Sequence, residues 1–553
     1  RDSMITIQLF EEHKDILESY QDKFQYIHVD EYQDTNEAQY RLVNTLAKKN
    51  QNICVVGDAD QSIYGWRGAN MQNILDFKKD YPAAHVTLLE QNYRSTKTVL
   101  DAANSVIAHN DNRADKNLWT ENPKGDQISY YRGQTENDEA RYVVAKIQEE
   151  MAKPNRNYGS FAILYRTNAQ SRVIEETLLK SNIPYTMVGG HKFYDRKEIR
   201  DALSYLTLLA NPNDSMSFER VINEPKRGIG QASIERLRLF ANDHGWSLLE
   251  ASKNVDLANE ISTRAKNSIS EFEQTMSAIA AKMDQLSITD ITEEILDKSS
   301  YLSTLKASKS LEAQTRLENL EEFISVTQKY DEENEGETGQ QNLVNFLSDL
   351  ALVSDQDSLE EDNAQVTLMT LHAAKGLEFP VVFLMGMEEG LFPLSRAAAD
   401  ESELQEERRL AYVGITRAKE KLYLTNAYSR MLYGRRQNNP ESRFVNEISP
   451  ELIHSDNQQQ TESPLTTPFD RRTRRATATT YHRPGKVVES PKGTGADKKA
   501  WAVGDKVSHK AWGTGTVVKV TGTGEDMELD IAFKQEGIKR LLAAFAPIKK
   551  QEN

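Results

Sequence analysis

The stretch Tyr26-Ile27-His28-Val29-Asp30-Glu31 places a short apolar run directly before two acids, and Ile53-Cys54-Val55-Val56-Gly57-Asp58 repeats the pattern. Short apolar runs of this kind predict buried strands. In parallel sheets, ligands bind at the carboxyl ends of the strands. The two stretches therefore predict an α/β domain with an acidic ligand site at one edge of its sheet.

Similar runs recur farther along the chain, with helix-like segments between them. They occupy residues 86–89, 162–165, 366–369, 381–384 and 422–424. This alternation favours parallel sheets covered by helices. Strong strand signals disappear from about 191 to 357, and they resume at Val366. That interruption predicts an all-helical domain inserted into the second α/β domain.

The C-terminal region has two parts that differ in amino-acid composition. Residues 453–500 are rich in Gln, Thr, Ser, Arg and Pro, which predicts a disordered linker. Residues 501–549 alternate and contain Gly-rich turns, which predicts a small β-barrel. The expected order is a first α/β domain, a second in two segments around the insertion, the linker and the barrel. The boundaries are 1–85, 86–190, 191–357, 358–452, 453–500 and 501–549.

Composition limits the class of protein. The chain has 553 residues, too many for one hydrophobic core, and it has no apolar run long enough to cross a membrane. The single cysteine, Cys54, excludes an intrachain disulfide, fits a reducing cytoplasm, and is expected to be buried as a small hydrophobe. A net charge of −16 weighs against nucleic-acid binding, but a DNA groove needs only local Lys and Arg.

The acidic pair Asp30-Glu31 suits nucleotide hydrolysis. One acid at a strand end can hold Mg²⁺ while the next orients or deprotonates a water molecule. An isolated Asp-Glu pair is more often a solvated turn, so the surrounding motifs have to decide between the two interpretations.

The surrounding motifs carry a resemblance to a known family. The segments are 29–35 (VDEYQDT), 56–69 (VGDADQSIYGWRGA), 89–95 (LEQNYRS), 370–379 (TLHAAKGLEF) and 407–419 (ERRLAYVGITRAK). In sequence and order they resemble the motifs of superfamily-one DNA helicases of the UvrD/PcrA type. The resemblance runs from about residue 20 to 450 and implies two RecA-like motor domains, the first of them incomplete here.

The resemblance implies a nucleotide site that uses ATP and Mg²⁺. In it Asp30 would bind Mg²⁺, Glu31 would activate the water, and Gln61 would contact the water or the γ-phosphate. Arg94 and Arg417 would be arginine fingers reaching across a cleft, so that hydrolysis needs domain closure. Tyr93 would stack on adenine, Glu378 would bind the ribose, and Gly376 would lie beside it. Without this context each arginine would more often be a surface ion-pair partner, and Tyr93 a core residue.

A single-stranded DNA site is implied as well, and such sites combine stacking aromatics with phosphate contacts. Trp66 would stack on a base, whereas Tyr64 is equally consistent with stacking and with a core position. Arg67, His372 and Lys375 are candidate phosphate contacts. Tyr165 follows a strand and is expected to line the same channel.

The inserted region contains Pro225-Lys226-Arg227-Gly228-Ile229-Gly230, which resembles a helix-hairpin-helix turn. Such a turn presents backbone N–H groups to phosphate, so Lys226, Arg227, Gly228 and Gly230 are candidate DNA contacts. An ordinary helix–helix connection is the alternative.

The terminal barrel resembles the Tudor-like module found at the end of PcrA-type chains, which implies RNA polymerase as a partner. A generic barrel is one alternative, and a duplex-DNA module using Lys506, Lys510 and Lys519 is another. The implied whole is an ATP-dependent 3′-to-5′ helicase acting on single strands and duplex junctions in repair and plasmid replication. Repair or plasmid-initiator proteins are further expected partners.

One family element is missing. The phosphate-binding loop Gly-x-x-x-x-Gly-Lys-Thr/Ser should precede the acidic pair, but no segment before Asp30 resembles it. We therefore expect this sequence to be a C-terminal fragment of a longer motor that hydrolyses ATP negligibly on its own. Two alternatives stay open: a catalytically inactive interaction module for DNA or RNA polymerase, and the motor subunit of a helicase–nuclease.

Overall fold

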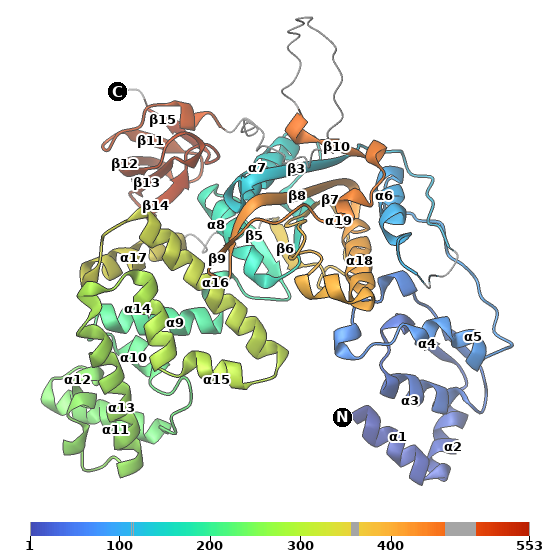
Figure 1. Ribbon diagram of the computed structural model, residues 1–553, viewed down its shortest axis with the longest axis horizontal. Coiled ribbons are helices and arrows are strands. Elements are labelled where there is room, and N and C mark those ends of the chain that lie inside the picture. The colour runs from blue at the N-terminus through green and yellow to red at the C-terminus, as the bar shows by residue number, and fades with distance from the viewer. Residues whose placement is uncertain (1, 112, 114–115, 355–363, 459–493, 552–553) are drawn as a thin grey trace, which may run out of the picture.

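The computed structural model describes residues 2–111, 113, 116–354, 364–458 and 494–551. Four parts follow from its sheets and helices. We call them the first lobe (2–85), the second lobe (86–190 and 364–458), the helical insert (191–354) and the barrel (494–551). Figure 1 shows the first lobe in blue and the helical insert in green, on opposite sides of the molecule below the sheet of the second lobe.

The first lobe is built on two short parallel strands, with Ile27 opposite Ile53 and Val29 opposite Val55. The strands are β1 (Ile27–Val29) and β2 (Ile53–Val55), and the helices are α1 (Asp2–Glu12), α2 (Lys14–Lys23), α3 (Glu37–Ala47), α4 (Gln72–Leu75) and α5 (Phe77–Asp80). A capping box between Asn36 and Gln39 starts α3 directly after the acidic segment. The apolar stretches before Asp30 and before Asp58 therefore both form strands, as predicted.

Two predictions are wrong, one for Cys54 in the first lobe and one for the segment that directly follows this lobe. Residues 86–89 are not a strand, and Val86, Leu88 and Leu89 are exposed. An apolar run becomes a strand only where another backbone pairs with it, and this run forms no ladder with a described strand. Cys54 is exposed rather than buried, because one face of the two-stranded sheet is uncovered in the described structure.

The second lobe contains a larger sheet in the order β10-β3-β8-β7-β4-β6-β5, and neighbours along this path are parallel. Its strands are β3 (Ile128–Thr135), β4 (Phe161–Tyr165), β5 (Tyr185–Val188), β6 (Val366–Thr370), β7 (Phe379–Leu384), β8 (Ala418–Leu432) and β10 (Ile453–Ser455), and β9 (Arg435–Gln437) forms a hairpin with β8. Strands β3 and β5 were not predicted from the sequence. Most of the predicted linker lies outside the described residues, but its first residues form β10.

Helices cover both faces of this sheet. They are α6 (Lys97–Ile107), α7 (Glu136–Met151), α8 (Ser171–Lys180), α18 (Glu401–Ile415) and α19 (Arg443–Asn446). Successive residues of a strand point to opposite faces. In β4, Ala162 and Leu164 join the core under α6 and α18, whereas Ile163 and Tyr165 join the core under α7 and α8. Burial on both faces explains the continuous apolar runs seen in the sequence.

The helical insert leaves the sheet after β5 and returns at β6, which pairs with β5. Its helices are α9 (Lys197–Ala210), α10 (Ser215–Val221), α11 (Gln231–His244), α12 (Leu248–Lys253), α13 (Thr263–Ala280), α14 (Ile288–Lys298), α15 (Tyr301–Ala307), α16 (Leu311–Glu333) and α17 (Gly339–Ser354). They enclose a hydrophobic core of their own. Because the flanking strands are neighbours, this part is an insertion into the second lobe.

The barrel is an antiparallel sheet in the order β14-β13-β12-β11-β15. Its strands are β11 (Lys506–His509), β12 (Gly513–Thr521), β13 (Glu528–Phe533), β14 (Gly537–Leu542) and β15 (Ile548–Lys550). Glu528 pairs with Lys180 of α8 at 2.6 Å, and Arg540 pairs with Asp349 of α17 at 3.0 Å. The barrel thus contacts both the second lobe and the helical insert, and the predicted fold class is confirmed.

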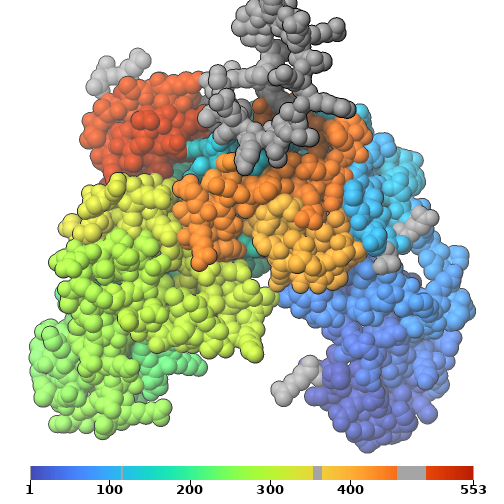
Figure 2. All heavy atoms as spheres, viewed as in Figure 1, coloured from blue at the N-terminus to red at the C-terminus, as the bar shows by residue number. Residues whose placement is uncertain are grey.

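Figure 2 shows the surface hollowed between the helical insert and the first lobe, with the second lobe closing the hollow from above. Among the described helices, none combines the length and the apolar character needed to cross a membrane.

Candidate functional site

The acidic pair lies at the carboxyl end of β1, as the sequence predicts. Asp30 and Glu31 are both exposed, and the Glu31 backbone N–H donates to Asp30 Oδ1 at 2.8 Å. Glu31 adopts a left-handed φ of 50°, which is uncommon for a residue with a side chain and is often found at functional sites. An exposed aspartate suits Mg²⁺, which usually keeps several waters and binds one or two carboxylates with substrate phosphates.

Gln33 links the acidic pair to the second strand. This buried amide donates from Nε2 to Glu31 Oε2 at 2.5 Å, and its Oε1 accepts the Asp58 backbone N–H at 3.0 Å. Asp58 Oδ2 in turn accepts from Gln61 Nε2 at 2.9 Å. Gly57 leaves room for this arrangement, because a Cβ there would lie 2.3 Å from Gln33 Oε1. Gln61 is therefore joined to Glu31 through a continuous chain of polar contacts.

Lys375 reaches this network from the second lobe. Its ammonium lies 3.1 Å from Glu31 Oε2, 2.5 Å from Asp34 Oδ2, and 3.0 Å from the Gln61 carbonyl oxygen, to which it donates. Burial raises the pKa of Asp34, and the hydrogen bond from Lys375 opposes that shift. The Lys375 side chain is only 8% exposed and its charge is paired with the two acids in this arrangement, so its assignment as a phosphate contact stays a prediction.

The two predicted arginine fingers meet at Thr416. Arg94 donates from Nη1 to the Thr416 carbonyl at 3.3 Å, and Arg417 donates from Nη2 to Thr416 Oγ1 at 3.1 Å. Arg417 also donates to the carbonyls of Val413 and Leu377. Burial, and then the nearby positive charge of Arg94, lower the pKa of Arg417 to about 10, while Glu31 is close enough to raise it. The two guanidinium groups therefore lie together, and Glu31 is close enough to Arg417 to act on its charge.

Glu378, the predicted ribose ligand, is paired with Arg94 at 2.5 Å and with Lys419 at 2.7 Å. Hydrogen bonds from Lys419 and Arg94 lower the pKa of Glu378 to about 2. Nearby, Gly376 has a φ of 86° and open space where a side chain would lie. This conformation favours glycine, and it leaves the backbone approachable.

Tyr93 is 79% exposed, and its hydroxyl donates to Gln91 Oε1 at 2.9 Å. The alternative of a core tyrosine is excluded by this exposure. Its ring face is therefore accessible to a planar partner.

An aromatic cluster lies at the junction of the two lobes. The Trp66 ring, 46% exposed, is 6.2 Å from the His372 ring in an edge-on arrangement and 6.4 Å from the Tyr64 ring, and the Arg67 guanidinium lies 4.4 Å from its centroid. Tyr64 is half-buried, and its hydroxyl donates to the His372 carbonyl at 3.2 Å. Tyr64 therefore bridges the lobes while still flanking Trp66. Burial and the charges of Arg166 and Arg67 lower the pKa of His372 to about 3, so this imidazole is neutral.

Tyr165 does not lie in this cluster. It is 1% exposed, and its hydroxyl contacts Met187 Sδ at 3.8 Å. Its position in β4 turns the side chain toward α7 and α8, so the expectation that it lines a DNA channel needs correction.

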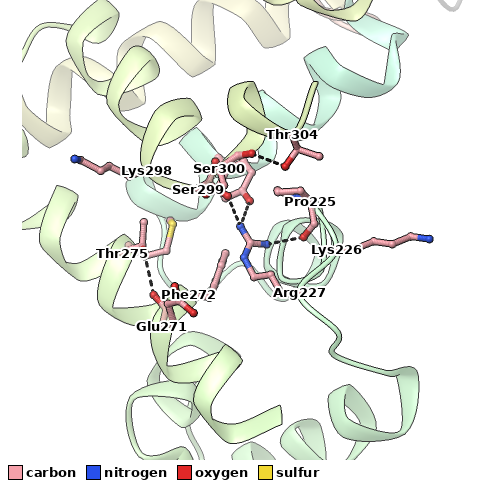
Figure 3. Close-up of a pocket in the computed structure, with 12 residues that line it drawn as sticks. Pro225, Lys226, Arg227, Glu271, Phe272, Thr275, Lys298, Ser299, Ser300 and Thr304 are labelled. Carbon is pink, nitrogen blue, oxygen red and sulfur yellow. Dashed lines mark hydrogen bonds between the residues drawn. The ribbon is translucent and has the colours of Figure 1, made fainter. Parts of the chain in front are cut away.

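The Gly-rich turn of the helical insert divides its basic residues. Figure 3 shows the Arg227 guanidinium turned inward and Lys226 pointing away from the cavity behind the turn. Arg227 donates to the carbonyls of Val221 and Ser299 at 3.0 and 3.1 Å, so its assignment as a phosphate contact needs correction. Lys226, Gly228 and Gly230 are exposed, and Gly230 directly precedes α11.

Several residues without a predicted role form polar contacts within the first lobe or between the two lobes. These are Gln33, Asp34, Asp58, Glu406 and Arg409: Glu406 accepts the Gly65 N–H at 3.2 Å, and Arg409 donates to the Ser62 carbonyl at 2.7 Å. Each lies inside or beside one of the five motif segments. The motifs indicated where these residues lie in the fold but not which residues they contact.

Comparison with known proteins agrees with this arrangement. Three family models match the chain: the UvrD/REP helicase N-terminal domain over residues 3–82, the UvrD-like helicase C-terminal domain over 87–429, and the PcrA/UvrD tudor domain over 503–550.

Similar proteins are found in several bacteria, and three named ATP-dependent DNA helicase PcrA illustrate them. The protein of Leuconostoc citreum is 55% identical over 552 residues, which cover 99% of this chain and 74% of the relative. That of Bacillus subtilis (strain 168) is 56% identical over 555 residues, with the same coverage. That of Staphylococcus epidermidis is 53% identical over 554 residues, covering 100% and 74% of the two chains.

Proposed function

This chain belongs to the UvrD-like helicase family and is an ATP-dependent DNA helicase, and we propose that it moves 3′ to 5′ along single-stranded DNA. Closure of its two lobes around ATP would drive each step. One observation carries the proposal: cationic side chains of the second lobe converge on the acidic pair of the first. Lys375 pairs with Glu31, and Glu31 lies near enough to Arg417 to influence its pKa.

The proposed chemistry divides between the lobes. Glu31 accepts the proton of the attacking water, and Gln61 orients that water through its link to the same network. Arg94 and Arg417 exchange their present acceptors for phosphate oxygens and neutralise the charge that develops on the transferred group. Mg²⁺, held by Asp30 together with phosphate oxygens, would supply further positive charge.

The nucleotide's adenosine would be held by the second lobe. Tyr93 presents an exposed ring for adenine. Glu378 stays ionised and can accept from ribose hydroxyls once Arg94 turns to phosphate. The positive φ of Gly376 keeps the adjacent backbone open to the sugar. Hydrolysis would thus release both the phosphate contacts and the arrangement around Glu378.

Single-stranded DNA would bind across the aromatic cluster at the lobe junction. Trp66 offers an exposed ring for base stacking, and Arg67 beside it offers charge for a phosphate. His372 contributes its ring but no charge. Since His372 and Lys375 lie three residues apart, a shift at the DNA surface would be transmitted to Glu31.

The helical insert and the barrel would supply partners. Lys226, Gly228 and Gly230 form an exposed turn suited to phosphates of a duplex at a junction. We assign RNA polymerase to the barrel by analogy with the module it matches. Exposed Lys506, Lys510 and Lys519 keep duplex DNA as the alternative for the barrel. Repair and plasmid replication in the cytoplasm, with repair or plasmid-initiator proteins as partners, are the processes we propose.

The test uses protein expressed from the complete reading frame of the gene, because the sequence here contains no phosphate-binding loop. Wild type and Glu31→Gln are compared for DNA-stimulated ATP hydrolysis and for unwinding of duplexes with a 3′ or a 5′ tail. The proposal expects unwinding of the 3′-tailed duplex alone, and loss of both activities in the variant. Unwinding from the 5′ tail would overturn the direction, and an active Glu31→Gln protein would overturn the assignment of the base.

A further inference from the structure

Two cationic side chains form ion pairs with the loop that carries Gln61. The Arg113 guanidinium donates to both carboxylate oxygens of Asp60, from Nε to Oδ1 at 2.9 Å and from Nη2 to Oδ2 at 2.8 Å. Asp60 is only 4% exposed, so this fork-to-fork pair is shielded from water.

Lys116 acts on the other acid of the same loop. Its ammonium contacts Asp58 Oδ1 and lies 3.4 Å from Asp60 Oδ2. The second oxygen of Asp58 accepts from Gln61 Nε2 at 2.9 Å. One carboxylate therefore joins Lys116 to Gln61, and each of its oxygens has one of these two partners.

The two cations belong to the second lobe, whereas the loop belongs to the first. Arg113 and Lys116 follow α6, and the start of their segment is fastened to α18: Asn110 donates to the Gln405 carbonyl at 2.9 Å and accepts from Arg408 at 2.6 Å. The end is fastened by the Asn117 N–H, which donates to Glu90 at 3.0 Å. The ion pairs of Arg113 and Lys116 with the Gln61 loop therefore depend on how closely the lobes approach.

We propose that Lys116, supported by Arg113, is a positioning residue that sets the orientation of Gln61 when the lobes close. The inference rests on the proposed role of Gln61 in ATP hydrolysis. A partly buried Asp58 with both oxygens engaged holds the Gln61 amide in one rotamer. When the lobes separate, the ammonium leaves, Asp58 Oδ1 keeps only the Asp60 backbone N–H as a donor, and Asp58 holds the Gln61 amide less firmly. Water positioning is thereby tied to closure by Lys116, a residue outside the five motif segments.

A purely structural ion pair would stabilise the segment without acting through Gln61. The two cases differ in a double-mutant cycle, because residues that act through one another have non-additive effects. The variants are Lys116→Gln, Gln61→Ala and the double substitution, in protein from the complete reading frame. Steady-state ATPase measurements separate kcat from KM, and fluorescence anisotropy measures single-stranded DNA affinity.

Lys116→Gln is expected to lower kcat by about ten- to hundredfold, as for a misplaced catalytic group. KM and DNA affinity should stay within roughly threefold, because neither site contains Lys116. Lys116→Arg, which keeps the charge, should recover most of kcat. Lys97→Gln is the matched control, since Lys97 begins α6 and is 60% exposed. In the Gln61→Ala background the Lys116 substitution should have no further effect.

Three outcomes overturn the inference. If Lys116→Gln lowers kcat by the same factor with and without Gln61, the contact is structural and the proposed function still stands. If Lys116→Gln leaves kcat unchanged while Gln61→Ala lowers it, the inference alone fails. If Gln61→Ala leaves kcat unchanged, the assigned role of Gln61 fails and the inference falls with it. Thermal melting identifies any variant that is unfolded, and Lys116→Arg then decides through its kcat.

Discussion

The ammonium of Lys375 lies 3.1 Å from a carboxylate oxygen of Glu31, although the two residues belong to different lobes. The same ammonium is bound to Asp34 and to the backbone of Gln61. A side chain with three such partners is not available to a DNA phosphate in this arrangement. The contact instead links Glu31, the proposed catalytic base, to the segment that carries His372.

This relationship predicts an effect on catalysis without an effect on the electrostatics of DNA binding. Lys375→Met should lower ATPase kcat while the salt dependence of single-stranded DNA affinity keeps its slope. Losing one phosphate contact would reduce that slope by about 0.7. Affinity is measured by anisotropy at several salt concentrations, with Arg67→Met as the comparison expected to change the slope. A reduced slope in Lys375→Met would restore the phosphate contact inferred from sequence.

Trp66 should dominate single-stranded DNA binding. Its exposed ring lies beside Arg67, and stacking on one base is worth about 1–3 kcal/mol, so Trp66→Ala should weaken binding roughly 5- to 150-fold. Trp119→Ala is a matched control, because Trp119 is also 46% exposed but lies outside the aromatic cluster. Anisotropy with a labelled oligo-dT measures both on the 553-residue chain. Equal losses in the two variants would argue against a stacking site at Trp66.

The sequence predicted that these segments would come together, since strand ends and motif order are local properties. Glu31, Gln61 and Arg417 do lie near one another across the two lobes, and their roles stay predictions. The partners of long side chains were less accessible to prediction. Lys375 and Arg227 lie where expected, but each flexible side chain turns inward to acceptors that are distant in sequence.

Strand faces and strand pairing were also beyond the sequence. Tyr165 ends a run buried on both faces, where no polar alternation shows which helices each residue meets. Residues 86–89 have the composition of a strand, but pairing is decided by distant backbone. The ion pairs of Arg113 and Lys116 with Asp58 and Asp60 could not be predicted for the same reason, because the two cationic residues are in a polar stretch with the composition of an ordinary loop.

Arg417 should matter for kcat far more than for nucleotide affinity. Its guanidinium lies beside Arg94 and is positioned by three acceptors, so Arg417→Lys keeps the charge but loses the planar fork. By comparison with other arginine fingers, kcat should fall by about 10³-fold. Arg396→Lys, a change at an exposed position, serves as the control. The assignment fails if Arg417→Lys retains kcat within roughly threefold of wild type.

The lowered pKa of His372 predicts that the free energy of unfolding depends on pH. Burial and neighbouring arginines lower its pKa to about 3, whereas an unfolded histidine titrates near ~6.5. Between these values the unfolded chain binds a proton that the folded chain excludes, so stability falls as pH falls from 6.5 toward 3. His509, whose pKa burial lowers to about 4, contributes in the same direction.

His372→Gln should therefore lose less melting temperature than wild type when the pH is lowered from neutral into this window. The exposed His109→Gln is the control and should follow wild type. Parallel curves for wild type and His372→Gln would show that the imidazole is protonated in the folded protein.

The barrel's attachment can be tested by exchanging charges. Glu528 of β13 pairs with Lys180 of α8 at 2.6 Å, and both side chains are mostly buried at the contact. Glu528→Lys places two ammonium groups together, which should weaken docking by about 1–3 kcal/mol because a partly buried charge is left without its partner. Lys180→Glu in the same chain restores an ion pair of opposite sense.

Limited proteolysis should therefore cleave the segment before the barrel faster in Glu528→Lys than in wild type, and the double variant should return toward the wild-type rate. Glu536→Lys, at an exposed position on the same module, is the control. If cleavage is equally fast in the double variant and in Glu528→Lys, the pair does not hold the barrel, and its seat depends on the buried Leu542 and Phe545 instead.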